Sequence, residues 1–405
     1  MLAIDDLDLE ILPVDDEAFA RDPDPWMNIA RAKHDWLARQ PYGYVVTDWR
    51  AMKDLLPQDD KLSIAIGPVI EIMGAGESPW GRFMSDILIA KSGAEHARIR
   101  GALEPFFKPR SVAAHIGRIR EVIDAQLDEW LPKGEFDFAD FAANFPITVM
   151  MGLIGADPAV LPEIRDHMEV QGLSFSLDRS LLPRLEKAIS EMARYVDGLI
   201  ADRRASGNKG DDLLAALIEA NDMGVLSDRE VNDVLIFLFG AGYDTSKNML
   251  TLVVHMLLDH PEMWERCATD RNYCIFAVEE GLRLTSPSSP PRLVTQDIVY
   301  RGVLIPKGTN LMFAGSIAGR DPKWFPDPMT YNPDRHHENR HIAFGRGMHL
   351  CLGQHLARLQ IEEGLHLITQ RMKHPRLVGE VTWRPFPGVW GIRSMPIAFT
   401  PAFKS

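Results

Sequence analysis

Cysteine is scarce in this chain, and its spacing offers neither a disulfide framework nor a Cys-x-x-Cys pair for a metal or redox site. Only Cys267, Cys274 and Cys351 occur among 405 residues. Such usage is typical of a reducing cytosol. Cys267 and Cys274 are seven residues apart, so we expect them to share one helix face and to be buried in the core, as unpaired cysteine usually is.

Long apolar runs and a positive charge balance are also missing. No stretch approaches the roughly 18 uninterrupted apolar residues that a transmembrane helix needs, and the acidic start at residues 1–10 lacks the basic and apolar regions of a signal peptide. The net charge of −13 argues against a nucleic-acid partner, because such a partner calls for a basic footprint. We therefore expect a cytoplasmic monomer that binds neither membranes nor nucleic acids.

The sequence shows no internal repeat, linker or low-complexity segment. It also lacks the alternation of strands and helices that would predict a doubly wound sheet. With 46% hydrophobic and 25% charged residues, its composition is that of a soluble globular protein. We expect one mainly helical domain with a small β part over residues 1–405, with an irregular acidic N-terminus at residues 1–25.

Periodicity and breaker residues place the expected elements along this domain. Ser227-x-x-Glu230 is a capping-box pattern and Pro261 is a stop signal, so a long helix is expected between them. Residues 57–93 are expected to form a long irregular loop. Further helices are expected at residues 26–39, through most of 94–218 and from 354, and strands at residues 42–48, 292–295, 298–300 and 303–305.

Ten residues near the C-terminus carry the most specific chemical signal. The segment Phe344-Gly-Arg-Gly-Met-His-Leu-Cys351-Leu-Gly353 is a glycine-rich turn that leads directly into a helical stretch. Backbone N–H groups and the positive end of a helix dipole stabilise a thiolate in that position. Gly345 and Gly347 permit the tight turn, and Gly353 lets the backbone approach the sulfur. For Cys351 alone, an inert buried cysteine is the alternative interpretation.

The pattern Phe-x-x-Gly-x-x-x-Cys-x-Gly resembles the haem-ligand loop of the cytochromes P-450, and the likeness extends over about residues 40–400. The resemblance implies the cytochrome P-450 fold in one haem-containing domain. It implies haem b with the Cys351 thiolate as the axial iron ligand, and Phe344 and Gly353 against the cofactor. The implied activity is that of a monooxygenase, which inserts one atom of O2 into a small hydrophobic molecule by hydroxylation or O-dealkylation.

The expected long helix carries a second signal at Gly240-Ala-Gly-Tyr-Asp244-Thr245-Ser246. Two glycines inside a helix each cost about 1 kcal/mol relative to alanine. Helical spacing places Ala241 and Thr245 on one face. A kink in which Thr245 bonds the Ala241 carbonyl is the structural interpretation. The resemblance instead makes Asp244 and Thr245 a catalytic acid–alcohol pair that delivers protons, with Ala241 beside the cofactor.

Two groups of charged residues take their meaning from the same resemblance. Glu280-Gly-Leu-Arg283 alone could be a surface ion pair worth about 0.3–0.5 kcal/mol. In the family's order it is similar to the Glu-x-x-Arg motif, with Arg335 as the third member of a buried structural network. The two haem propionates need cationic donors. The residues at the matching positions are His96, Arg100, Arg292 and His349.

Substrate contacts can be assigned by position, and they are mostly apolar, which fits a small hydrophobic molecule. Core packing is the alternative for each of them. They are Ile66, Val69, Phe175, Phe237, Leu293, Val294, Val389 and Trp390. The bacterial class that the chain resembles implies electrons from a ferredoxin, itself reduced by an NAD(P)H-dependent ferredoxin reductase. Docking would require a local basic patch, for which the candidates are Arg346, Arg358, Lys108 and Arg110.

Other functions have some support in the sequence. His337-Glu338-Asn-Arg-His341 matches the zinc-protease pattern H-E-x-x-H, but this pattern works only on a helix, and its flanks show no helical periodicity. Gly240-x-Gly242 lacks the third glycine and the preceding strand of a dinucleotide-binding loop.

A third possibility retains the haem without the monooxygenase chemistry. The chain would then be a peroxide-driven peroxygenase or a non-catalytic haem-binding protein. The intact Asp244–Thr245 pair argues against the peroxide-driven type, because peroxide already carries the electrons and protons that the pair helps to deliver.

Overall fold

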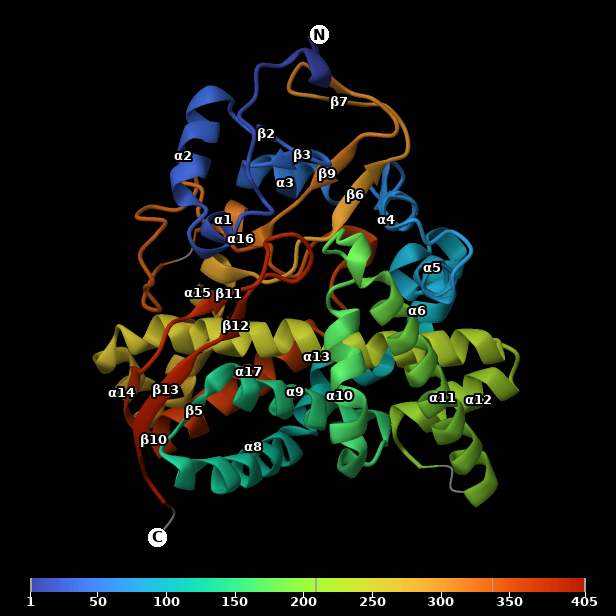
Figure 1. Ribbon diagram of the computed structural model, residues 1–405, viewed down its shortest axis with the longest axis vertical. Coiled ribbons are helices and arrows are strands. Elements are labelled where there is room, and N and C mark those ends of the chain that lie inside the picture. The colour runs from blue at the N-terminus through green and yellow to red at the C-terminus, as the bar shows by residue number, and fades with distance from the viewer. Residues whose placement is uncertain (1, 208–209, 337, 404–405) are drawn as a thin grey trace.

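One long helix, α13 (Asp228–Leu258), crosses the molecule (Figure 1). The computed structural model describes residues 2–207, 210–336 and 338–403. The 31 residues of α13 span about 46 Å at 1.5 Å per residue. The side chain of Ser227 accepts from the Glu230 N–H, and the Glu230 carboxylate accepts from the Ser227 N–H. Arg98 bonds the same carboxylate and lowers the pKa of Glu230 to about 2. The expected helix and its capping box are confirmed.

Most of the chain is helical, and several helices lie directly against α13, three of which also position the site. These are α9 (Phe138–Ile154), α15 (Arg271–Thr285) and α17 (Gln354–Arg371). A further pair, α10 (Leu161–Gln171) and α11 (Leu182–Ser206), also packs on α13. The other α-helices are α1 (Glu17–Arg21), α2 (Asp24–Lys33), α3 (Trp49–Leu55), α4 (Ile66–Met73), α5 (Pro79–Asp86), α6 (Gly93–Phe107), α7 (Pro109–Ala113), α8 (Ile116–Trp130), α12 (Leu213–Asp222), α14 (Pro261–Thr269) and α16 (Gly315–Gly319).

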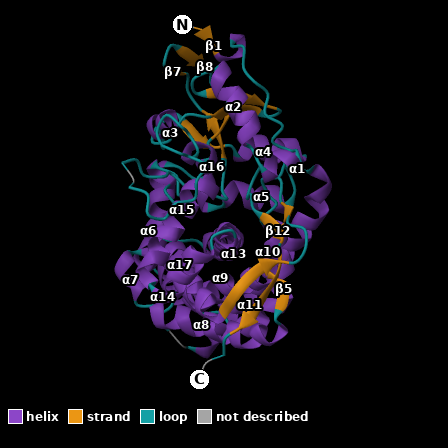
Figure 2. Ribbon diagram, turned by 90° about the vertical axis from the view of Figure 1, so that its left-hand side faces the viewer, coloured by secondary structure: helices purple, strands orange, loops and turns teal. Residues whose placement is uncertain are grey.

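Among the described residues the strands form four small sheets (Figure 2). The largest has the order β2-β3-β9-β6-β4, in which only β3 and β9 are parallel. Its strands are β2 (Leu37–Gln40), β3 (Gly43–Val46), β9 (Asn310–Met312), β6 (Pro291–Val294) and β4 (Leu62–Ile64). The smaller sheets combine β1 (Leu2–Ala3), β8 (Val303–Ile305) and β7 (Ile298–Tyr300); β10 (Met372–Leu377), β13 (Pro396–Pro401) and β5 (Glu135–Asp137); and β11 (Thr382–Trp383) with β12 (Ile392–Ser394).

The expected class, mainly helical with a small β part, is confirmed. The predicted strands correspond to β3, β6, β7 and β8, and the helix expected from residue 354 is α17. The helical stretch expected over residues 94–218 is interrupted by β5, whose partner β13 lies far away in the sequence. A strand that depends on such a distant partner leaves little local signal.

The prediction of an irregular loop at residues 57–93 is wrong. The segment contains β4, α4 and α5. Gly74 ends α4 in the left-handed conformation with φ 68°, and Ser78 caps α5 by accepting from the Gly81 N–H. Pro79 stands in the first turn of α5, where proline is tolerated. The glycine and proline residues that favour a loop at these positions are therefore helix boundaries here.

The N-terminal predictions also need correction. The helix expected at residues 26–39 ends at Lys33, and Leu37–Gln40 forms β2 against β3. Residues 1–25 are not irregular throughout, because they include β1 and α1. Pairing with β8 and β3 stabilises these strands, and that pairing is set by tertiary structure.

Cys267 and Cys274 are both fully buried, as expected. They do not share a helix face, because Asp270 separates α14 from α15 and caps the second helix. The Cys274 thiol instead donates to the carbonyl of Cys267 across the break, at 3.4 Å.

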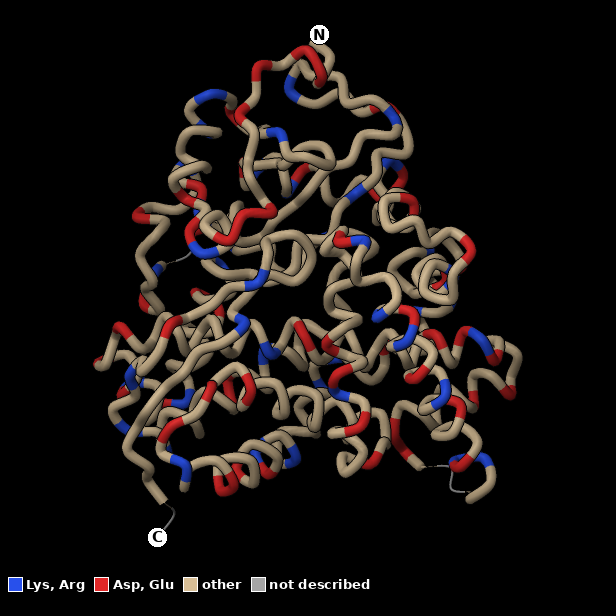
Figure 3. Tube along the Cα trace, in the orientation of Figure 1, with Lys and Arg blue, Asp and Glu red and all other residues tan. Residues whose placement is uncertain are grey.

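Charged residues of both signs are spread along the chain (Figure 3). Within the part of the chain that the structure describes, no helix has the length and apolar character needed to cross a lipid bilayer.

Candidate active site

The glycine-rich loop carries Cys351 to an internal cavity. Gly345 and Gly347 adopt φ values of 72° and 73°, in the left-handed region that favours glycine. The Cys351 N–H donates to the Phe344 carbonyl at 2.9 Å and closes the turn. Burial raises the pKa of the Cys351 thiol, whereas a hydrogen bond from the Gly353 backbone lowers it. Cys351 is nevertheless accessible, and it lines the cavity. Its accessible surface therefore faces the cavity.

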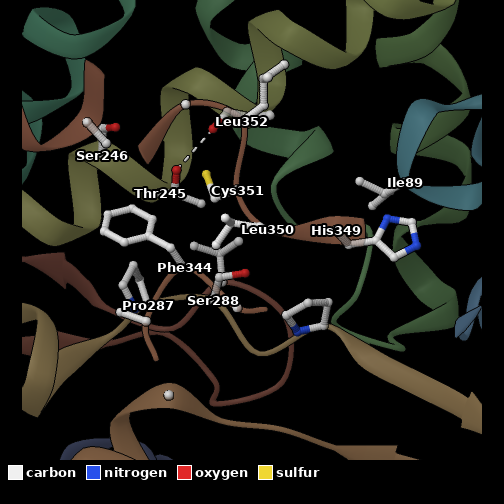
Figure 4. A pocket seen from close by; sticks show the side chains of 18 of the residues that line it. Ile89, Thr245, Ser246, Pro287, Ser288, Phe344, His349, Leu350, Cys351 and Leu352 are labelled. Carbon is white, nitrogen blue, oxygen red and sulfur yellow. Dashed lines mark hydrogen bonds between the residues drawn. The ribbon is translucent and has the colours of Figure 1, made fainter. Parts of the chain in front are cut away.

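The cavity beside Cys351 has a volume of about 350 Å³ and a mostly apolar lining (Figure 4). Phe237, Ala241 and Thr245 line it from α13, and Phe344 and Leu350 line it from the cysteine loop. Ala241 is exposed although its neighbours in the middle of α13 are buried or half-buried, because it faces this space. The cavity can therefore take a large apolar group that has a thiol against it.

Four cationic or basic side chains converge on one part of the same cavity. They are His96, Arg100, Arg292 and His349, all of which line it. The rings of His96 and His349 lie 5.0 Å apart, and Arg100 Nη2 donates to the Leu350 carbonyl at 2.9 Å.

No acidic side chain among the described residues forms an ion pair with this cluster, and the pKa values of His349 and Arg292 are lowered. Burial and then the neighbouring Arg292 lower the pKa of His349 to about 3, and burial lowers the pKa of Arg292 to about 10. Arg292 Nη1 and His349 Nδ1 are buried and have no hydrogen-bond partner among the described residues. Such groups call for an anion. An apolar cofactor with carboxylate groups and a thiolate-bound metal fits this site, as haem b would.

On α13, Thr245 Oγ1 donates to the Ala241 carbonyl at 3.0 Å. This bond is the one that the kink interpretation expects. The same threonine lines the cavity, so its hydroxyl is placed both to bond the helix and to face a bound molecule. Figure 4 shows Thr245 and Cys351 among the residues that line this cavity.

Asp244 points away from the cavity lining and into the protein. It is 1% exposed, pairs with Arg384, and accepts from Asn248 Nδ2 at 3.1 Å. Its second oxygen, Oδ2, has no hydrogen-bond partner among the described residues. A Cβ atom added to Gly172 would lie 2.2 Å from that oxygen, so the end of α10 packs closely over the carboxylate.

Arg384 is a site residue that sequence reasoning missed. It follows β11, 140 residues beyond Asp244, and it is 7% exposed. Nothing in its local sequence distinguishes it from a surface arginine. Only the packing of this hairpin on α13 brings it to the carboxylate.

The residues of the Glu-x-x-Arg motif form a closed network. Glu280 and Arg283 are both fully buried, and Arg283 contacts both Glu280 carboxylate oxygens, at 2.6 and 2.8 Å. Arg335 Nε donates to Glu280 at 3.1 Å. Arg283 also donates to the carbonyls of Gly319 and Pro328, at 2.6 and 2.7 Å. The network ties α15 to the segment that precedes the cysteine loop.

Arg358, one of the candidates for the ferredoxin-docking patch, forms an ion pair within the protein. The Arg358 guanidinium donates to Glu279 at 2.5 Å and lies 4.3 Å from the centre of the Phe344 ring. Arg358 is thus part-buried and paired, and its place in a docking patch stays a prediction. The other candidates, Arg346, Lys108 and Arg110, are exposed.

Three of the expected substrate contacts line the cavity, namely Phe175, Phe237 and Val389. The other five are not part of the lining among the described residues, and their assignment is corrected. They are Ile66, Val69, Leu293, Val294 and Trp390.

The corrected residues pack elsewhere for identifiable reasons. Trp390 is 1% exposed, and its Nε1 donates to the Ala20 carbonyl at 2.7 Å. Leu293 follows Arg292 on β6, and successive side chains of a strand point to opposite faces. Ile66, Val69 and Val294 belong to the buried hydrophobic core.

The zinc-protease pattern has no structural support. His337 lies outside the described residues. Glu338 to His341 are not helical, and His341 contacts Glu279 at 3.2 Å. No group of three or more His, Cys, Asp or Glu side chains that could hold a metal occurs among the described residues.

Comparison with known proteins agrees with this geometry. The cytochrome P-450 family matches residues 169–376. Luteothin monooxygenase of Streptomyces thioluteus is 33% identical over 398 residues, which cover 97% of this chain and 96% of that protein. Steroid C26-monooxygenase of Mycolicibacterium smegmatis is 32% identical over 78% of this chain and 80% of that protein.

The fold has close counterparts among solved structures. The crystal structure of CalO2 superposes with a TM-score of 0.86 at 26% identity, covering 96% of this chain and 98% of that one. A thiol on a glycine-rich loop, an apolar cavity and similarity to monooxygenases over most of the chain thus agree: the chain belongs to the cytochrome P-450 family and is a P-450 monooxygenase.

Proposed function

We propose that this monooxygenase oxidises a neutral, mainly apolar organic molecule, by hydroxylation or O-dealkylation. The composition of the cavity lining carries the proposal. Its charged or basic members are His96, Arg100, Arg292, His349 and Arg358. The first four form the cluster that fits the cofactor, and the fifth pairs with Glu279. No described charged side chain of the lining is then left to bind a substrate carboxylate. That one relative is named for a steroid supports this class.

Different residues of the chain would bind the cofactor and supply protons at the site. Haem b, when bound, would supply the iron that activates O2. Cys351 would hold that iron as a thiolate, and the four cationic side chains would bind the propionates. Thr245 would place its hydroxyl oxygen, Oγ1, beside the reacting molecules. Asp244, tied to Arg384, would orient the proton supply behind it. The apolar lining would exclude bulk water.

Substrate binding tests the proposal directly. A panel of apolar carboxylic acids and their methyl esters is titrated against the purified holoprotein, and binding is followed by the spin-state shift of the haem absorption band. The esters are expected to bind about 100-fold more tightly than the acids, because an unpaired buried carboxylate costs several kcal/mol. Acids that bind more tightly than their esters would overturn the proposed substrate class.

We further propose that a ferredoxin supplies the electrons and docks at the exposed cations near the cysteine loop. Arg346→Glu is expected to slow reduction of the haem by ferredoxin about tenfold at low salt, because charge at an interface rim mainly governs the association rate. Substrate binding should not change. Arg194→Glu on α11, an exposed arginine with the same charge change, serves as the control. Equal reduction rates for wild type and Arg346→Glu would refute this docking site.

A further inference from the structure

Asp59 joins the segment before β4 to the loop that carries Cys351. Its Oδ2 accepts a hydrogen bond from the Met348 N–H at 2.7 Å. A Cβ atom added to Gly347 would lie 2.7 and 2.8 Å from the two Asp59 carboxylate oxygens, closer than side-chain contacts normally come. The Asp59 carboxylate therefore occupies the space that any side chain at position 347 would need.

The segment that presents Asp59 is held in place by its own hydrogen bonds. The N–H groups of Lys61 and Leu62 both donate to the Gln58 carbonyl at 2.9 Å, and the Thr295 N–H donates to the Lys61 carbonyl at 2.8 Å. Strand β4 then pairs with β6, with Ile64 opposite Arg292. The same pairing thus positions the Asp59 segment and one member of the cationic cluster.

The charge of Asp59 acts on that cluster without neutralising it. Burial lowers the pKa of Arg292 and of His96, and the negative charge of Asp59 raises both pKa values in return. Asp59 makes no ion pair with any described residue. Arg292 Nη1 has no hydrogen-bond partner among the described residues and can bind an anionic ligand. The negative charge of Asp59 is close enough to raise the pKa of Arg292.

We propose that Asp59 is a positioning residue with two separable effects: its carboxylate oxygen fixes the turn that carries the thiolate ligand, and its charge lowers the reduction potential of the haem. The proposal rests on haem ligation by Cys351 but not on the identity of the substrate or the electron donor. A negative charge beside the cofactor site would disfavour the reduced state, which carries one more electron. Hydrogen bonding around the ligand loop and local charge are established means by which a protein tunes a haem.

Two substitutions separate the effects. Asp59→Asn retains an oxygen that can accept from Met348 but removes the charge, whereas Asp59→Ala removes both. The matched control is Asp60→Asn, an exposed neighbouring carboxylate. The reduction potential of each purified holoprotein is measured by spectroscopic titration with a chemical reductant. The share of thiolate-ligated haem is then measured from the reduced carbon monoxide spectrum in dilute guanidinium.

The expected pattern is specific. Asp59→Asn should shift the potential in the positive direction and keep its thiolate-ligated share. Asp59→Ala should show the same direction of shift and lose the thiolate signature at a lower guanidinium concentration, and Asp60→Asn should match wild type in both. An unchanged potential in Asp59→Asn overturns the proposal, even where Asp59→Ala fails to fold. Chemical reduction needs neither substrate nor ferredoxin, so failure of the proposed function would leave these measurements intact.

Discussion

Replacing Cys351 by serine is expected to abolish the monooxygenase activity while leaving the fold intact. Serine fits the same turn, because the positive φ values at Gly345 and Gly347 that shape it do not depend on residue 351. Its hydroxyl, however, is not deprotonated near neutral pH and donates far less electron density to an iron than a thiolate does. Product formation should fall by about 1,000-fold or more, within the range that enzymes contribute to such chemistry.

The reduced carbon monoxide spectrum is the decisive measurement for this variant, because it distinguishes thiolate ligation from other ligation. Cys274→Ala provides a control with one sulfur fewer, taken from the buried core. It should lose some stability, as large-to-small core substitutions do, and keep the thiolate spectrum. A thiolate-type spectrum in Cys351→Ser would refute the assignment of Cys351 as the ligand.

Replacing Thr245 by alanine is expected to separate electron consumption from product formation. The Thr245 hydroxyl lines the cavity and also bonds the Ala241 carbonyl. Its loss should leave haem and substrate binding unchanged but waste electrons as peroxide. The product formed per electron should fall about 100-fold, the lower end of what a positioned proton donor contributes. The test compares NAD(P)H consumed, peroxide released and product formed.

Thr251 offers a matched control on the same helix. Its hydroxyl makes the same type of bond, to the Lys247 carbonyl at 2.8 Å, and the residue is fully buried outside the cavity lining. If Thr245 only shapes the helix, Thr245→Ala and Thr251→Ala should couple electrons to product equally well. Tight coupling in Thr245→Ala would refute its role in proton delivery.

Local signals predicted the parts of the fold that depend on neighbouring residues. The capping box at Ser227 and Glu230 and the stop at Pro261 correctly placed α13, because a helix is stabilised by residues close in sequence. The same reasoning fails at residues 57–93, because glycine and proline favour a loop, whereas Gly74 and Pro79 mark helix ends here. Strand β5 leaves little local signal because the strand that it pairs with, β13, is a distant segment.

The substrate contacts show a similar limit. Phe175, Phe237 and Val389 reach the cavity, whereas Trp390, next to Val389, is buried against the carbonyl of Ala20. Apolar side chains suit a core and a substrate cavity equally well, because both exclude water. Sequence position therefore cannot separate the two environments.

The sequence by itself determined the chemistry of the site: a thiol on a glycine-rich turn at Cys351, a threonine after an acid on a long helix, and a Glu-x-x-Arg pair. Each of those features lies within a short stretch of sequence, so it can be recognised without knowing the fold. Only the tertiary structure decided how they are held. Arg384 pairs with Asp244 across 140 residues, Arg358 pairs with Glu279, and Asp59 bonds the cysteine loop. In the local sequence, each of these is an ordinary charged residue. A charged side chain pairs with a group that is close in space, and that proximity depends on how distant elements pack.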